Sequence, residues 1–116
     1  PGSCTSRIEL KEHHFNSNQV VHGGVISGLI DSAAGIAVRS ARTPEAIAAA
    51  PNATSDLHVQ YLSAARGTEL TATARVLKAG RTAVFADVDV RDDQGRIVAR
   101  GSGTFVISPA QRRAGA

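Results

Sequence analysis

The chain has 116 residues, of which 42% are hydrophobic and 20% charged, the balance of a single globular domain over residues 1–116. The formal net charge of +3 suits an anionic small ligand. The aromatic residues (three Phe, one Tyr) are scattered and no run of Lys and Arg exists, so we expect no nucleic-acid binding. The single cysteine, Cys4, excludes an internal disulfide, and no apolar run is long enough to cross a membrane. We expect a cytoplasmic protein with no membrane partner, metal or redox cofactor.

The N-terminal half of the chain predicts one strand and two helices. Alternating apolar residues indicate a strand over Thr5–Glu12, followed by a polar connection over residues 13–21. One long helix runs from Gly24 to about Ala41, and its apolar residues lie nearly all round the wheel, which is typical of a buried helix. Pro44 suits a first helical position, so a short helix is expected through Ala50.

The C-terminal half predicts four consecutive antiparallel strands. Period-two alternation begins at Ala53, and further strands cover Glu69–Lys78, Val84–Val90 and Arg96–Ile107. In the third of these strands the Val and Ala side chains share one face, while the Phe and two Asp share the other. The segment Asp92–Gly95 has the Asp and Gly chemistry of a hairpin turn. This order of elements predicts an α+β fold in which one sheet is covered by a single long helix.

The last predicted strand contains Gly101 and Gly103, two residues apart on one face. The missing side chains would let a helix approach the sheet closely. A β-bulge or plain sheet curvature would explain the same pair, and the sequence does not choose between these explanations.

The ends of the chain lie outside the predicted elements. The chain begins at Pro1 and contains no methionine, so we expect a processed or engineered start and leave residues 1–3 out of the first strand. Pro109 is expected to stop the last strand, and Arg112 and Arg113 to lie on a frayed tail.

Asp31 is the only ionisable residue between Val25 and Val38, within the predicted long helix. A carboxylate among so many apolar groups is costly unless it is paired, hydrogen-bonded or neutralised. Such a group is a candidate general base toward water, or a nucleophile on an acyl carbon. The alternative is a structural carboxylate satisfied by neighbouring hydroxyls, for instance those of Ser27 or Ser32.

The residues before Asp31 form a second candidate feature. Gly23 and Gly24 open the helix, where orphan N–H groups and the dipole favour negative charge, as in an oxyanion hole; a plain packing turn is the alternative. His22 suits donation to a leaving group, or else a helix cap. Asn16 suits orientation of water or a carbonyl, or else a turn. The histidines have no metal-ligand spacing, so we assign no metal.

Helix geometry separates these two features. Gly23 and Asp31 are eight residues apart, about 12 Å along a helix that rises 1.5 Å per residue. An Asp side chain does not span that gap. If both groups act on one carbonyl, they must come from different protomers, and a two-fold axis would supply two such sites. The catalytic interpretation therefore predicts an obligate homodimer.

These motifs together resemble those of the hotdog-fold acyl-CoA thioesterases, over about residues 8–107. The matching segments are Asn16, Val21-His22-Gly23-Gly24, Asp31, Val59-Gln60-Tyr61-Leu62 and Lys78-Ala79-Gly80-Arg81. The chain is most similar to the phenylacetate-pathway and 4-hydroxybenzoyl-CoA thioesterase branch. The resemblance implies one long central helix wrapped by a curved antiparallel sheet, with protomers paired edge to edge and dimers commonly paired into homotetramers.

The resemblance also implies roles for the candidate residues. The N–H of Gly23 would polarise the thioester carbonyl, with His22 and Asn16 as supporting polar groups in the same pocket. Asp31 of the partner subunit would be the base or the nucleophile. Thr54 falls where the family often has a hydroxyl residue that helps to hold the attacking water.

A third implied feature is a contact with the CoA moiety of the substrate. Lys78, Arg81 and Thr82 lie at a turn where related enzymes meet the CoA phosphates. Arg66, in the preceding loop, is a further candidate by its charge alone.

We therefore expect an acyl-CoA thioesterase that hydrolyses an aryl- or medium-chain acyl-CoA to the free acid and CoA. Hydrolysis needs no cofactor, and the sequence leaves open both the acyl group and the choice between base and nucleophile. Two other functions remain open: a hotdog module that binds acyl-CoA without turnover, and a hotdog enoyl-CoA hydratase.

Overall fold

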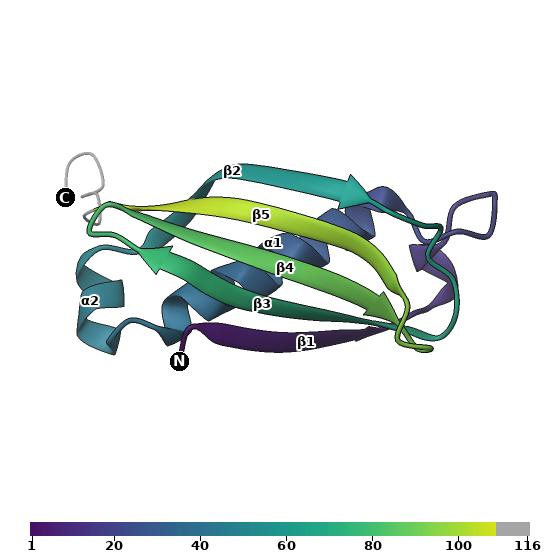
Figure 1. Cartoon of the computed structure of the whole chain (residues 1–116), viewed down its shortest axis with the longest axis horizontal. Coiled ribbons are helices and arrows are strands. Elements are labelled where there is room, and N and C mark those ends of the chain that lie inside the picture. The colour runs from purple at the N-terminus through teal and green to yellow at the C-terminus, as the bar shows by residue number, and fades with distance from the viewer. Residues whose placement is uncertain (109–116) are drawn as a thin grey trace, which may run out of the picture.

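A five-stranded antiparallel sheet, with its strands in the order β1-β3-β4-β5-β2, carries one long helix across one face (Figure 1). The structure is a computed structural model that describes residues 1–108. In chain order the elements are β1 (Ser3–Glu9), the 3-10 turn η1 (Glu12–His14), α1 (Gly23–Ser40), α2 (Pro44–Ala49), β2 (Asn52–Tyr61), β3 (Glu69–Ala79), β4 (Ala83–Asp92) and β5 (Ile97–Ile107). The predicted α+β plan, with one sheet and one long helix, is confirmed.

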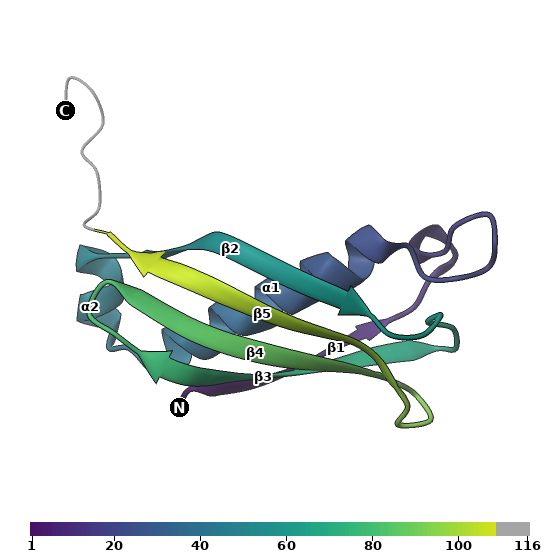
Figure 2. The same cartoon turned by 45° about the horizontal axis from the view of Figure 1, so that its top comes forward.

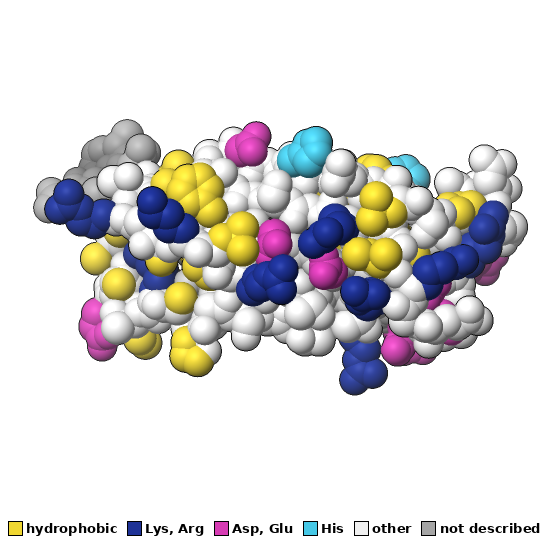
Figure 3. Space-filling model, viewed as in Figure 1, with side chains coloured by type: hydrophobic (Ala, Val, Ile, Leu, Met, Phe, Trp, Pro, Cys, Tyr) yellow, Lys and Arg dark blue, Asp and Glu magenta, His cyan; other side chains and the backbone are white. Residues whose placement is uncertain are grey.

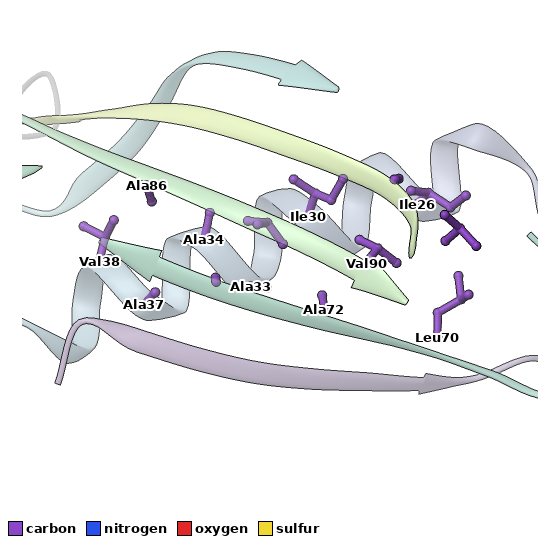
Figure 4. Close-up of a cluster of buried hydrophobic side chains, with 14 of the residues drawn as sticks. Ile26, Ile30, Ala33, Ala34, Ala37, Val38, Leu70, Ala72, Ala86 and Val90 are labelled. Carbon is purple, nitrogen blue, oxygen red and sulfur yellow. The ribbon is translucent and has the colours of Figure 1, made fainter. Parts of the chain in front are cut away.

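Helix α1 packs against the sheet through one face only (Figure 2). Its buried residues recur three or four positions apart, as one helical face requires; they are Ile26, Ile30, Ala33, Ala34, Ala37 and Val38. Figure 4 shows them beside Leu70, Ala72, Ala86 and Val90 of the sheet. The prediction of a helix buried all round is wrong for the protomer, because a single sheet covers only one side. Ile36, on the other side, is 50% exposed.

The two faces of β4 are those predicted. The side chains that face the helix are buried: Val84, Ala86, Val88 and Val90. On the outer face, Arg75 pairs with Asp87 at 3.1 Å and Arg100 pairs with Asp89 at 2.9 Å. Figure 3 views this outer face and shows basic and acidic side chains next to each other over the middle of the sheet. The alternation along β4 therefore separates a buried apolar face from an outer face that carries ion pairs.

Gly101 marks the point where α1 comes closest to β5. A Cβ built at Gly101 would lie 2.6 Å from Cγ2 of Ile30, which is fully buried. A Cβ at Gly103 would lie 3.0 Å from the ring of Phe105. Close approach of the helix therefore explains Gly101, while Gly103 leaves room for a neighbouring aromatic ring.

Strand β1 begins and ends earlier in the chain than the predicted Thr5–Glu12. Ser3 pairs with Arg75 of β3, and the N–H of Val76 donates to the carbonyl of Gly2 at 2.7 Å. Of the three residues that we had set aside at the start of the chain, Ser3 therefore belongs to β1, and Gly2 is hydrogen-bonded to β3. The strand ends before Glu12, where the 3-10 turn begins.

Strand β2 is an edge of the sheet. It pairs with β5 on one side, and none of the other four strands lies along its second side. An edge strand of 10 residues presents a row of backbone N–H and C=O groups that a second chain can bind. This edge is next to the open side of α1.

No helix within residues 1–108 is long and apolar enough to span a membrane. The stop at Pro109 and the tail with Arg112 and Arg113 lie outside the described residues.

The hairpin between β4 and β5 is built around Asp92, as its Asp and Gly residues predicted. Its carboxylate accepts from the N–H groups of Gln94 at 3.0 Å and Arg96 at 2.9 Å, and from Nε of Arg96 at 3.1 Å. Gly95 supplies the left-handed conformation with φ of 79°. Burial is the largest influence on the Asp92 pKa and raises it. The hydrogen bonds and charge from Arg96 and Gln94 together outweigh burial and leave the pKa below its ordinary 3.8.

We predict that Gly101→Ala destabilises the fold. The added Cβ would lie 2.6 Å from Cγ2 of the fully buried, β-branched Ile30, so the free energy of unfolding should fall by about 1–3 kcal/mol. Ser102→Ala, one residue on and exposed, is the control and should stay within about 0.5 kcal/mol of the native protein. Chemical denaturation measures both; equal midpoints for the two variants would contradict the close approach.

We also predict a pH dependence from Asp92. A lowered folded-state pKa means that the carboxylate stabilises the fold above its ordinary 3.8 and loses that contribution as pH falls through the folded-state value. Native protein should therefore exceed Asp92→Asn in stability at neutral pH, and the difference should shrink below about pH 4. Denaturation midpoints of both proteins from neutral to acid pH test this; a constant difference would contradict it.

Candidate active site

The start of α1 leaves one amide donor unused. Nδ1 of His22, the N-cap, accepts from the N–H of Gly24 at 2.9 Å, and the carbonyl of His22 accepts from the N–H of Val25 at 2.9 Å. None of the described residues accepts from the N–H of Gly23. This N–H therefore points out of the first turn as a free donor at the positive end of a helix of 18 residues.

His22 has the capping role that the sequence left open. Because Nδ1 accepts a hydrogen bond, a neutral His22 ring carries its proton on Nε2. The ring is exposed, so Nε2–H remains available as a donor beside the Gly23 amide. Capping and a supporting role in the site are thus compatible.

Asn16 has the turn-forming role. Its Oδ1 accepts from the N–H groups of Asn18 at 2.9 Å and Val20 at 3.2 Å, which shapes the loop before the helix. An isolated bridge between Phe15 and Val21 closes that loop. Oδ1 of Asn16 is thereby occupied within the loop, and Nδ2 is the part of the side chain that can still bind a ligand.

Tyr61 belongs to this end of the site, although we did not select it as a site residue from the sequence. Its hydroxyl donates to the carbonyl of Gly23 at 2.9 Å. A Cβ built at Gly23 would lie 3.3–3.4 Å from the phenol group. Together with Val21, Ile26 and their neighbours, Tyr61 lines a cavity of about 320 Å³ at the helix start. In the sequence, Tyr61 stood only at the end of the alternating pattern and within a segment of the family resemblance, and neither says what its side chain touches across the fold.

Asp31 lies at the rim of a second cavity, between α1 and the start of β2. It is half-buried, and its Oδ1 accepts from Oγ1 of Thr54 at 2.7 Å. The cavity has a volume of about 290 Å³ and is also lined by Ile36, Arg39 and Phe105. Neither Ser27 nor Ser32 binds the carboxylate; Ser27 instead donates to the carbonyl of Gly24. Asp31 is half-buried because it lies on the side of the helix that the sheet does not cover.

The two halves of the predicted site are apart in the protomer. Gly23 and Asp31 belong to one uninterrupted helix, about 12 Å apart along its axis, and border different cavities. A single protomer therefore offers an anion-binding amide at one place and a hydroxyl-supported carboxylate at another.

The candidate CoA contacts are also divided. Arg66 precedes β3, at the end of the sheet where Val21 N–H bonds the carbonyl of Ala65, next to the helix start. Lys78, Arg81 and Thr82 lie at the opposite end of β3, whose 11 residues span roughly 35 Å at about 3.3 Å each. One protomer does not bring Arg66 and the other three residues to the same phosphate group.

The Gly23 amide and the Asp31 carboxylate are groups of the kinds that acyl transfer to water requires. A free amide at a helix N-terminus stabilises a developing oxyanion, and a carboxylate with one oxygen held by a hydroxyl has its other oxygen free for a proton or a carbon. Among the described residues no group of three or more His, Cys, Asp or Glu side chains is placed to hold a metal ion. An oxyanion donor and a helix-borne carboxylate are groups that an ester or thioester hydrolase on a hotdog fold can use.

The chain belongs to the thioesterase superfamily, whose family model matches residues 18–99, and it is a thioester hydrolase. It is 31% identical to mouse acyl-coenzyme A thioesterase 13 over 106 residues, which are 90% of this chain and 72% of that protein. It is 30% identical to the medium/long-chain acyl-CoA thioesterase YigI of Escherichia coli, over 78% of this chain and 64% of the relative.

A solved structure has the same fold. A Bacillus halodurans protein crystallised with CoA superposes with a TM-score of 0.85 at 28% identity, covering 92% of this chain and 68% of that one. The predicted hotdog fold, one long helix against a five-stranded antiparallel sheet, is thereby confirmed.

Proposed function

We propose that the protein hydrolyses acyl-CoA thioesters to a carboxylic acid and free CoA, at a site that two protomers share. The observation that carries this proposal is that two groups suited to the same reaction lie far apart on α1. The free N–H of Gly23 is an oxyanion donor, and the Asp31–Thr54 pair is a supported carboxylate, yet one rigid helix keeps them about 12 Å apart. A partner helix running in the opposite direction brings the two together.

The reaction then proceeds in two steps. Water attacks the thioester carbon while Asp31 of the partner subunit accepts its proton, and the carbonyl oxygen takes the negative charge beside the Gly23 amide. The tetrahedral intermediate collapses by breaking the carbon–sulfur bond, so that CoA leaves as the thiol after taking up a proton. Thr54, which holds Oδ1 of Asp31, orients the carboxylate so that Oδ2 faces the water. Direct attack by Asp31 through an anhydride is the other route compatible with this placement.

The open side of α1 supports the proposed homodimer. Gly24, Gly28, Asp31 and Gly35 fall on one helical face by their spacing, and a Cβ built at Gly28 would meet nothing within 4 Å in the protomer. A two-fold axis level with residue 27, midway between Gly23 and Asp31, lets two such faces approach closely. The free edge of β2 is available to pair with its counterpart. We propose that two dimers associate into a homotetramer.

We propose an aryl or medium-chain acyl group for the substrate, as in the phenylacetate and 4-hydroxybenzoyl-CoA branch of the family. The cavity next to Asp31 supports this, because its volume of about 290 Å³ and the apolar side chains of Ile36 and Phe105 suit a compact acyl group. The Escherichia coli relative is named for medium and long chains.

The CoA moiety meets basic groups in this proposal. Arg66 lies beside the helix start, and Lys78, Arg81 and Thr82 lie at the far turn. These two groups of residues act on CoA from different protomers, because the length of β3 separates them within one chain. The Bacillus halodurans structure, crystallised with CoA, supports a CoA site on this fold.

The first test removes the charge of Asp31. Asp31→Asn keeps the shape and the contact with Thr54 but no longer accepts a proton, so kcat should fall by about a hundredfold or more. Release of free thiol from a panel of aryl- and alkyl-acyl-CoAs measures this. Glu45→Gln, an exposed helix-borne carboxylate outside both cavities, is the matched control and should retain native turnover. Equal turnover by Asp31→Asn would remove this residue from the mechanism, and tight binding without turnover by the native protein would favour a binding module.

The second test separates the helices. Gly28→Leu has room in the protomer, so folding should be kept, while the proposed helix contact is blocked. We expect a monomer by light scattering and a loss of turnover of about a hundredfold. Ala41→Leu, at the exposed C-terminal cap of the same helix, should remain dimeric and active. A Gly28→Leu protein that is dimeric with native turnover would contradict the shared site.

A further inference from the structure

Tyr61 connects the end of β2 to the first turn of α1. Its hydroxyl donates to the carbonyl of Gly23 at 2.9 Å, and its phenol group lies 3.3–3.4 Å from the position that a Cβ of residue 23 would take. The side chain is nevertheless 53% exposed, so this arrangement is not a consequence of core packing. The contact joins elements that are 38 residues apart in the chain.

A terminal turn of a helix frays more easily than its middle, and two glycines there increase the fraying. Glycine loses more conformational entropy on ordering than any other residue, and the first N–H groups of a helix lack intrahelical partners. Residues Gly23 and Gly24 would therefore sample many orientations without further contacts. A catalytic oxyanion donor has the opposite requirement, because it must point at one place before the reaction begins.

Two peptide planes control the direction of the Gly23 N–H, and both are held. The plane between Gly23 and Gly24 is held on its two sides: Tyr61 donates to its carbonyl and Nδ1 of His22 accepts from its N–H at 2.9 Å. The plane that carries the Gly23 N–H is held through the His22 carbonyl, which accepts from Val25 at 2.9 Å. Of these contacts, only that of Tyr61 comes from another element of the fold.

We propose that Tyr61 is a positioning residue for thioester hydrolysis: it fixes the first turn of α1 to the sheet and so keeps the Gly23 N–H aimed at the carbonyl oxygen. This inference rests on the proposed function. It also explains why residue 23 is glycine, since any side chain there would press on the phenol ring. The ring also lines the cavity of about 320 Å³ at the helix start.

The test is Tyr61→Phe, which removes the hydroxyl and keeps the ring. We expect kcat to fall about tenfold with KM within about twofold, because binding surface is kept while the donor loosens; complete loss of an oxyanion donor costs about 10²–10³. In the same protein, solvent exchange of the Gly24 amide, measured by NMR, should become about tenfold faster. This second readout does not depend on activity.

Ser40→Ala is the matched control. Ser40 also donates its hydroxyl to a carbonyl of α1, that of Ala37 at 2.8 Å, but in the last turn of the helix. We expect this variant to keep native kcat and native exchange at Gly24, even if its denaturation midpoint falls as much as that of Tyr61→Phe.

Each other outcome overturns the inference in its own way. Unchanged exchange at Gly24 in Tyr61→Phe would show that the phenol does not hold the helix start, whatever the activity. Faster exchange with kcat within about twofold of native would reduce the contact to a structural one. A native protein that hydrolyses no acyl-CoA would instead refute the proposed function, and the inference about hydrolysis with it, while the exchange rates would still report on the contact.

Discussion

The rigidity of one helix is the constraint on which the rest of the structure depends. Because α1 is an uninterrupted helix of 18 residues, its N-terminal amide and its mid-helix carboxylate are held at a fixed separation and never meet within one chain. A loop at the same place would let them fold together. The helix thus makes any joint action of Gly23 and Asp31 depend on a second protomer. A reaction that uses both groups therefore requires the dimer to form first.

Close packing against the sheet sets where the two groups lie. Ile30 fits against Gly101, and the alanines of the buried face allow α1 to lie close to β3 and β4. Because that face of α1 packs against the sheet, Asp31 lies at the groove beside β2, where the Thr54 hydroxyl donates to its carboxylate at 2.7 Å. The same packing leaves Gly28 and its neighbours without cover. The position of the carboxylate and the open face next to it therefore have a single cause.

Periodicity predicted the elements well because it depends on the chain's own neighbours. The alternation in β4 and the turn at Asp92 needed no information from elsewhere in the molecule, and both are as expected. The exposure of Asp31 could not be predicted, for the complementary reason. Its neighbours in sequence are apolar, but the residues that decide its exposure are those across the groove. The contacts with Thr54 and Tyr61 bridge more than 20 residues of chain, and no local pattern reports them.

The polar groups at the helix start show how little of the site is free to react. Oδ1 of Asn16 shapes the loop, Nδ1 of His22 caps the helix, and the carbonyl of Gly23 is taken by Tyr61. Each of these contacts satisfies a group that would otherwise compete for the substrate or allow the turn to move. The Gly23 amide hydrogen is left without an acceptor among the described residues, and its direction is fixed by its neighbours' bonds. A backbone donor held in this way needs no reorganisation as charge develops, so in the proposed mechanism the residues around it act chiefly by restricting the position of that amide.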